Sequence, residues 1–346
     1  MGATQRTKLP WVNLFRPPRV LLAVACTALV AGCSPAVVTV TAGAPVTVSA
    51  GPTVTTPAAA APPSRATTSP SPSNSASSGA TPSGAGGETA SEPRVEVVEL
   101  SSVPNFRDVA GSGKGLRLAD GTRMATGLVY RSGLLEGMSA ADRATLADAG
   151  LETIFDLRTD EVARNHPDPA IKGAEYRLVN VYAVARQPRD DPPDAAAARR
   201  RAIERNRAFV TDPAQRERIA SVLTGIARAD APVLVHCTEG KDRTGWISAM
   251  LQIVAGADRP TVIAEYLASN RYRAALIEKK VAATLRSEGA TRAAAVRTAA
   301  TVERSWLVAG LDAATARYGS IEGYLTGGLG LSETTLAHLR DRLRGE

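Results

Sequence analysis

A stretch of low complexity limits the part of this chain that can form a packed core. Between Ser34 and Pro93, all but four of the 60 residues are Ala, Gly, Pro, Ser, Thr or Val. Such a segment cannot bury enough apolar surface to offset the entropy of ordering it. We therefore predict a disordered linker over residues 34–93 and one folded domain over residues 94–346, which is long enough for a well-packed core.

The positive charge of the chain does not indicate a nucleic-acid-binding protein. The net charge is +7, but residues 94–346 carry 36 basic and 32 acidic side chains. A domain with so mixed a surface is not one that coats a polyanion. The aromatic content of 4% also disfavours the stacking of bases. We expect no nucleic-acid partner.

The first 33 residues have the pattern of an export signal. Four basic residues and no acidic one precede an apolar run over Val20–Ala31, which is too short to span the ~30 Å core of a bilayer as a helix. The run leads into Val30-Ala-Gly-Cys33, which resembles a bacterial lipobox. We predict that residues 1–33 are a lipoprotein signal peptide, that Cys33 is lipidated, and that the protein is exported to the outer face of the cell membrane or secreted. An ordinary signal peptide and an uncleaved anchor are the alternatives.

Cysteine usage narrows the chemistry of the folded domain. The chain has three cysteines, and only Cys237 lies beyond the signal and linker. This excludes an intradomain disulfide, a CxxC redox site and a thiolate-rich zinc site, and three histidines in the whole chain disfavour a histidine zinc site. We expect no metal and no cofactor. A lone thiol in an oxidising compartment is a liability unless its chemistry is used.

Cys237 lies in a loop between a predicted strand and a predicted helix. Asp212-Pro213 predicts the start of an amphipathic helix that runs to about Ala229, and residues 232–235 read as a short buried strand. The loop His236-Cys-Thr-Glu-Gly-Lys-Asp-Arg-Thr-Gly245 comes next, followed by apolar residues at helical spacing. The carboxyl end of a strand, next to a helix N-terminus, is where an α/β sheet places its ligand site.

The residues of this loop are those that phosphoryl transfer through a thiolate requires. A helix N-terminus and a ring of backbone N–H groups lower the pKa of Cys237 and receive phosphate oxygens. Arg243 can bind two of these oxygens through its planar guanidinium, and Asp242 can protonate the leaving oxygen and then activate water. The remaining predicted substrate-binding residues are Thr238, Glu239, Gly240 for a tight turn, Lys241 as a charge at the rim, and Thr244 as a hydrogen-bond donor to the sulfur.

The chain resembles the bacterial tyrosine/serine protein phosphatase family, which is cysteine-dependent. The resemblance runs from about Val103 to Arg344, and the loop matches H-C-x-x-G-K-D-R-T-G at every fixed position. Shorter motifs also carry it: Asn105-Phe-Arg-Asp-Val109, Tyr130-Arg-Ser-Gly133, Asp156-Leu-Arg158, Ile263-Ala-Glu-Tyr-Leu267 and Tyr318-Gly-Ser-Ile-Glu-Gly-Tyr-Leu325. It implies an α/β phosphatase fold with a central, mostly parallel sheet flanked by helices. It also implies hydrolysis of phosphotyrosine, and often of phosphoinositides, with Asp242 as the acid.

Glu239 departs from the pattern of this family, whose close members have a small residue there. A carboxylate beside a phosphate dianion is repulsive unless it points away or pairs with Arg or Lys. This puts activity on highly phosphorylated inositides in question.

The sequence thus predicts a metal-independent protein tyrosine phosphatase that forms a phosphocysteine on Cys237, with phosphoserine and phosphothreonine as further substrates. A phosphoinositide lipid phosphatase is the alternative, indicated by Gly240-Lys241. Arsenate reduction is disfavoured because the domain has no resolving thiol. A catalytically dead phosphate-binding module is disfavoured because Cys237 and Arg243 are both present. A nucleotide P-loop is excluded because Val235 and Asp242 stand where Gly and Ser or Thr are needed.

Other segments support this fold without deciding the function. Ser139 is a predicted N-cap of a helix to Ala149, with Gly150 after it, and residues 153–157 read as a strand. Arg131, Asp156 and Arg158 either support the site or form a structural ion pair. We interpret Asp108 as structural, His236 as orienting the loop, His166 as a loop residue and His338 as a surface residue.

Two helical segments lie outside the catalytic motifs. Residues 194–207 predict a solvated basic helix. Residues 271–304 are helical and rich in alanine, with a break at Gly289. The resemblance allows this second segment to form a lid over the site, and a plain pair of surface helices is the alternative.

Overall fold

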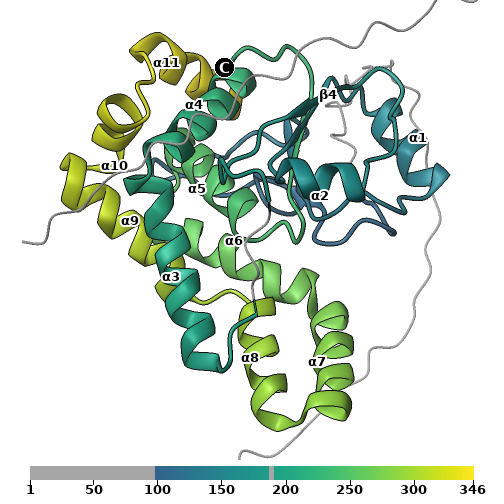
Figure 1. Cartoon of the computed structure of the whole chain (residues 1–346). Coiled ribbons are helices and arrows are strands. Elements are labelled where there is room, and N and C mark those ends of the chain that lie inside the picture. The colour runs from purple at the N-terminus through teal and green to yellow at the C-terminus, as the bar shows by residue number, and fades with distance from the viewer. Residues whose placement is uncertain (1–97, 187–190) are drawn as a thin grey trace, which may run out of the picture. The chain divides into compact units, whose positions relative to one another are not determined.

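The computed structural model describes residues 98–186 and 191–346 (Figure 1). The predicted signal peptide, the linker and Cys33 lie outside these residues. Within the described ranges, no helix combines the length and the apolar character needed to cross a bilayer.

A mostly parallel sheet forms the centre of the domain. Its strands, within the described part of the chain, are β1 (Arg107–Asp108), β2 (Val129–Ser132), β3 (Thr153–Asp156), β4 (Glu175–Leu178) and β5 (Val233–His236). The order across the sheet is β1-β2-β5-β3-β4. Only β1 runs antiparallel to its neighbour, so the sheet class expected from the sequence is confirmed. The middle strand, β5, ends directly before Cys237.

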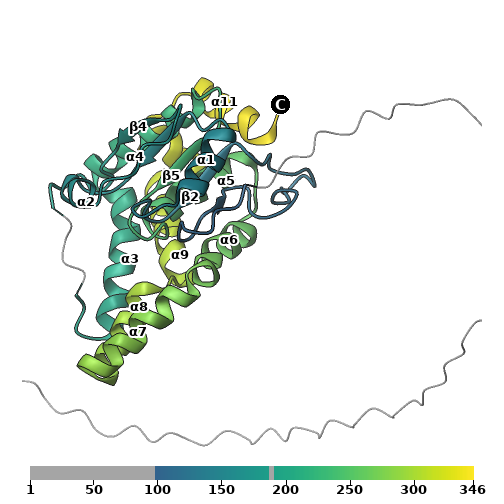
Figure 2. The same ribbon diagram turned by 90° about the vertical axis from the view of Figure 1, so that its right-hand side faces the viewer.

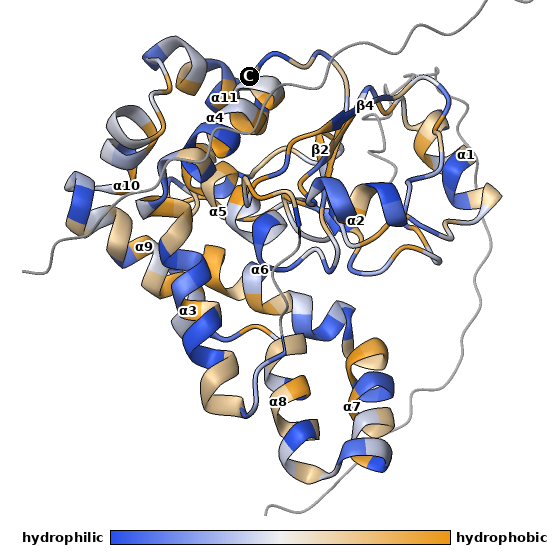
Figure 3. Ribbon diagram, in the orientation of Figure 1, coloured by the Kyte–Doolittle hydropathy of each residue, from blue (hydrophilic) through white to orange (hydrophobic). Residues whose placement is uncertain are grey.

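Strands β2, β3 and β5 are buried on both faces because each places alternate side chains into two different cores. Val233 and Val235 of β5 enter the larger core, whereas Leu234 between them enters the smaller one. Phe155 and Ile154 of β3 divide in the same way. The strands around β2 accordingly carry the orange of apolar residues in Figure 3. Burial on both faces leaves only the strand ends for chemistry.

Helices cover both faces of this sheet (Figures 1 and 2). The larger core is built largely from α4, α5, α9 and α11, and the smaller one includes Leu146 of α1. The helices are α1 (Ala140–Asp148), α2 (Asp160–Asn165), α3 (Ala195–Thr211), α4 (Pro213–Ala227), α5 (Arg243–Ala255), α6 (Arg259–Tyr272), α7 (Ala274–Glu288), α8 (Ala290–Ala300), α9 (Arg304–Tyr318), α10 (Ile321–Gly323), the π-helix η1 (Tyr324–Gly328) and α11 (Glu333–Arg344).

The capping residues expected from the sequence begin their helices as predicted. The Asp212 carboxylate accepts the backbone N–H groups of Ala214 and Gln215 at the start of α4, and this helix ends two residues before the predicted Ala229. Ser139 caps α1 in the same way. Gly150 follows α1 with a φ of 70°, a conformation that favours glycine.

The basic helix is longer and less solvated than predicted. Helix α3 continues to Thr211, and one of its faces is buried against other helices, chiefly α8 and α9. The expectation of a simply solvated helix is wrong because alanines and Phe209 alternate with the arginines at helical spacing, which gives α3 one apolar face.

Helices α7 and α8 form a hairpin with its own small core. The predicted break at Gly289 is confirmed, with a φ of 85°. The hairpin buries Ile277, Val281 and Val296 in a separate cluster, and it projects from the rest of the domain in both views (Figures 1 and 2). That this hairpin forms a lid over the site stays a prediction.

Candidate active site

The cysteine loop joins β5 to α5, as the sequence predicts. The strand ends at His236 and the helix begins at Arg243, so residues 237–242 lie at the carboxyl end of the central strand. Cys237 is 2% exposed, and its sulfur accepts a hydrogen bond from the Gly240 N–H at 3.3 Å. Thr238 is exposed, so the loop meets solvent there.

Gly240 lets the loop curl around the sulfur. Its φ is 67°, and a Cβ atom at this position would clash with the backbone carbonyl of Ser132. Only glycine fits both the conformation and the space. The tight turn predicted for Gly240 is thereby confirmed.

The surroundings of Cys237 favour the thiolate. Burial by itself raises the pKa of this thiol, but the positive charge of Arg243 and the hydroxyl and amide of Thr244 outweigh it, so the pKa lies below its ordinary value. The Thr244 hydroxyl is buried beside the sulfur and has no other hydrogen-bond partner among the described residues. It is therefore available to donate as charge returns to the sulfur.

Arg243 is held beside the sulfur by contacts that leave part of its guanidinium available. One Nη donates to the Leu157 carbonyl at 3.1 Å, and the other donates to Thr238 Oγ1 at 3.4 Å. The guanidinium lies 4.3 Å from the ring centroid of Tyr182. Its Nε is buried and has no hydrogen-bond partner among the described residues. This donor can bind a phosphate oxygen.

Lys241 is not at the rim of the loop, so that expectation is wrong. Its side chain is 1% exposed, because its Nζ turns inward, 5.5 Å from the ring centroid of Trp306, and donates to Asp242 Oδ2 at 2.8 Å. The ammonium group is thus buried together with a carboxylate partner. Lys241 therefore acts on the charge of Asp242 and only indirectly on a substrate.

The charges around Asp242 control when it can act as an acid. Burial raises the pKa of this carboxyl, but Lys241, Arg205 and Arg243 together bring it below its ordinary value. Asp242 is therefore ionised in the free enzyme near neutral pH. A phosphate dianion bound beside it acts in the opposite direction and raises the pKa.

A buried network fixes the loop from behind. Arg131, which is 0% exposed, donates to the Gly240 carbonyl at 2.8 Å and pairs with Glu265 of α6 at 2.7 Å. Arg107 pairs with the other oxygen of Glu265 at 2.5 Å, and Asn105 donates to the Gly240 carbonyl at 2.8 Å. Arg131 thus supports the site, one of the two roles predicted for it.

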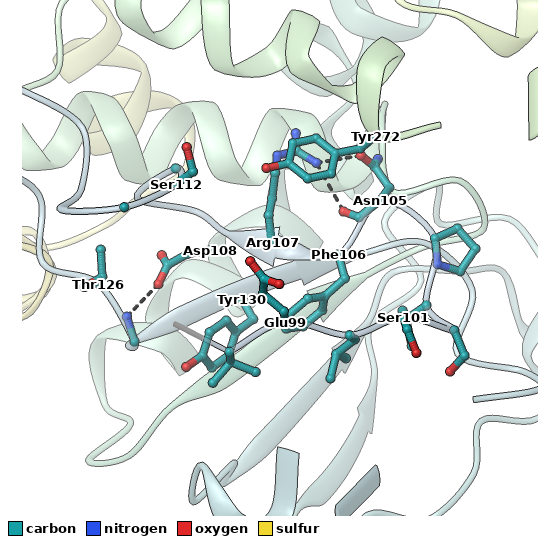
Figure 4. A pocket seen from close by; sticks show the side chains of 18 of the residues that line it. Glu99, Ser101, Asn105, Phe106, Arg107, Asp108, Ser112, Thr126, Tyr130 and Tyr272 are labelled. Carbon is teal, nitrogen blue, oxygen red and sulfur yellow. Dashed lines mark hydrogen bonds between the residues drawn. The ribbon is translucent and has the colours of Figure 1, made fainter. Parts of the chain in front are cut away.

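Figure 4 shows how Asn105 and Arg107 connect this network to a neighbouring cavity. Arg107 donates to Asn105 and lies 4.7 Å from the ring centroid of Tyr272. The cavity has a volume of about 570 Å³ and is also lined by Asp108 and Tyr130. Burial raises the pKa of Asp108 to about 6, and its carboxylate accepts the N–H groups of Ala110 and Gly127. These contacts agree with a structural role for Asp108.

Asp156 and Arg158 form a structural ion pair, the other of the two predicted roles. Arg158 Nη2 lies 2.7 Å from Asp156 and 3.0 Å from Asp168, and His236 Nε2 lies 2.9 Å from Asp168. Asp156, Asp168 and His236 could together offer ligand atoms to a metal. The guanidinium of Arg158 already supplies the positive charge between the two carboxylates, so these residues do not fit a metal ion well.

The other two histidines are exposed, whereas Cys237 is buried. His166 is the C-cap residue of α2, and its half-exposed ring pairs with Glu136 at 2.9 Å. His338 is exposed on α11, as predicted for a surface residue.

Comparison with known proteins identifies the family. The sequence model described as the tyrosine phosphatase family matches residues 98–345. The triple specificity protein phosphatase PtpB of Mycobacterium tuberculosis is 31% identical over 284 residues, which cover 72% of this chain and 99% of that protein. A protein of Cupriavidus necator, provisionally named a tyrosine-protein phosphatase, is 30% identical over 69% of this chain and 85% of its own length. The chain belongs to the tyrosine phosphatase family and is a phosphoric monoester hydrolase.

A solved structure is also similar in part. The crystal structure of P. aeruginosa TpbA in complex with pTyr is 22% identical, covers 40% of this chain and 67% of its own, and has a TM-score of 0.25.

Proposed function

We propose that this protein dephosphorylates phosphotyrosine in proteins through a phosphocysteine on Cys237. The observation that carries the proposal is the position of the Cys237 sulfur, which accepts the N–H groups of Gly240 and Thr244 and lies beside Arg243. A thiolate in this position can attack a phosphorus atom whose oxygens the N–H groups and the guanidinium bind.

The reaction has two steps. The thiolate sulfur bonds to phosphorus while the phosphorus–oxygen ester bond breaks, and the tyrosine oxygen leaves with a proton from Asp242. Asp242 then takes a proton from water, whose oxygen attacks phosphorus. The sulfur–phosphorus bond breaks, inorganic phosphate leaves, and the thiolate is restored with the hydroxyl of Thr244 beside it.

The phosphoinositide alternative is less well supported by the loop. It is based on Gly240-Lys241, and the Lys241 side chain is buried and paired with Asp242. The relative from M. tuberculosis is named for triple specificity, so further substrates should be tested. Those expected from the sequence are phosphoserine, phosphothreonine and phosphoinositides. Phosphotyrosine and phosphoserine peptides and a phosphoinositide should be assayed in parallel at equal enzyme concentration. The highest kcat/KM is expected on the phosphotyrosine peptide, and a higher value on the inositide would contradict the proposal.

We further propose that the enzyme is an exported lipoprotein acting outside the cytoplasm, anchored through Cys33. The support is the sequence pattern alone, and the test is a pair of cysteine variants. Cys33→Ser should shift the protein from the membrane fraction to the soluble or secreted fraction, because the acylated residue is lost. Cys26→Ser, in the apolar run, is the matched control and should stay in the membrane fraction. Unchanged fractionation of Cys33→Ser would rule out this anchor.

Asp242→Asn should separate poor leaving groups from good ones. General-acid assistance contributes roughly 10²–10⁴ in rate and is needed most when the leaving oxygen is basic. We therefore expect kcat/KM, which reports the steps up to the phosphocysteine, to fall by that factor on phosphotyrosine or phenyl phosphate and by much less on an activated aryl phosphate. Asp242 acts as an acid only when protonated, so wild-type activity should fall as the pH rises through its pKa in the substrate complex. The asparagine variant should lose this alkaline limb. Equal losses of kcat/KM on both substrates would instead assign Asp242 to loop structure.

A further inference from the structure

Glu239 has a carboxylate in the catalytic loop that the proposed reaction does not use. Its side chain is 31% exposed, next to the exposed Thr238, so it lies where the loop meets solvent. A negative charge there would repel a phosphate dianion unless it is paired. The contacts of Glu239 show how it is paired.

Two buried cations take up the charge of Glu239. Its Oε1 accepts a hydrogen bond from Arg273 at 2.6 Å, and its Oε2 lies 3.7 Å from the Lys241 ammonium. The side chain of Arg273 is 7% exposed, and its other Nη donates to the Ala300 carbonyl at the end of α8. Arg273 is therefore fixed beside the loop by a second, independent contact.

Four charged groups of and beside the loop pair with one another. Lys241 and Arg273 are positive, and Glu239 and Asp242 are negative, so the four groups sum to zero. Arg243 is left to bind the phosphate that reacts. A second phosphate close to the reacting one would need its own cation, because placing it beside uncompensated oxygens is repulsive. Arg273 and Lys241, the two cations beside Glu239, are both already paired with it.

We propose that Glu239 is a specificity-determining residue that restricts the site to substrates with one phosphate near the reacting atom. It does so by pairing with Arg273 and Lys241, which are then not available to a second phosphate. Removing its charge while keeping its shape, as in Glu239→Gln, leaves the other three of these groups with a net charge of one positive unit. The inference rests on the proposed phosphatase function and adds the substrate class to it.

The test uses two soluble short-chain phosphoinositides that share the reacting phosphate and differ by one neighbouring phosphate. The readout is the ratio of kcat/KM for the doubly phosphorylated substrate to that for the singly phosphorylated one. Glu239→Gln should raise this ratio by ~10-fold, the scale of one charge interaction at a partly exposed site. Arg273→Gln should lower the ratio, because it leaves the Glu239 charge less compensated. Glu217→Gln, which removes an exposed carboxylate on α4, is the control and should leave the ratio unchanged.

A binding measurement keeps this inference separate from the proposed reaction. In a Cys237→Ser background, the Kd of the doubly phosphorylated head group should fall relative to that of the singly phosphorylated one when Glu239→Gln is added. If wild type turns over no phosphotyrosine while this shift in Kd occurs, the proposed function fails and the role of Glu239 stands. If Glu239→Gln, folded as judged by its Tm, moves neither the kcat/KM ratio nor the Kd ratio by more than twofold, the role of Glu239 is overturned.

Discussion

Cys237→Ser is expected to lose turnover of p-nitrophenyl phosphate and phosphotyrosine by a factor on the order of 10⁴–10⁶. The physical reason is that a thiol is a much stronger acid than a hydroxyl. The loop holds the pKa of the Cys237 thiol below its ordinary value through Arg243 and Thr244, whereas a serine hydroxyl stays protonated in the same place. Steady-state rates at high enzyme concentration measure the loss.

Two controls make this result specific. The serine variant should still bind inorganic phosphate and keep the Tm of the wild type. Only one atom changes, oxygen for sulfur, and the backbone of the loop is fixed by Arg131 and Asn105. EDTA should leave wild-type activity intact, since the proposed steps use only side chains and water. Residual turnover in Cys237→Ser near the wild-type rate, or loss of wild-type activity with EDTA, would contradict the mechanism.

Arg243→Ala should reduce kcat/KM by roughly 10³-fold or more, the scale on which arginine stabilises charge in phosphoryl transfer. Two effects add. The phosphate loses its guanidinium partner, and the pKa of Cys237 rises because Arg243 is the main charge that lowers it. The acidic limb of the pH–rate profile should therefore move to higher pH, since activity appears only as the thiol ionises.

Arg243→Lys is the matched variant, because it keeps the charge without the planar fork. It should restore the acidic limb towards the wild-type pH while leaving kcat/KM low. Tyr182→Phe tests the ring that lies against Arg243, and it should keep most activity because the ring face remains. An Arg243→Ala enzyme with an unchanged pH profile would show that the arginine does not act on the thiol.

The parts of the site that lie close together in the sequence could be predicted from it. The strand at 233–236, the loop and the helix from Arg243 are determined by a short apolar run, a glycine and helical spacing within about two dozen residues. The positions of Cys237 and Arg243 follow from this local order. The bend at Gly240 could likewise be predicted, since few other residues adopt its φ.

The supporting groups could not be found in this way because they come from distant segments. Asn105 and Gly240 are 135 positions apart, and Arg273 and Glu239 are 34 apart. The sheet order and the packing of α6 bring them together, and neither is encoded in local spacing. A charged residue such as Glu265 between buried apolar neighbours on α6 was the available signal of a buried partner. The position of the Lys241 side chain was predicted wrongly for another reason: sequence spacing does not determine where a side chain in a loop points.

The central claim is that phosphorus becomes bonded to Cys237, and rapid acid quenching followed by mass spectrometry tests it most directly. The Asp242→Asn enzyme should be used with an activated aryl phosphate, because the first step then needs no acid while the second still lacks its base. We predict that the peptide containing Cys237 carries one phosphoryl group and that Cys237→Ser abolishes this signal. A phosphoryl group on any other residue, or none at all while turnover proceeds, would contradict the account.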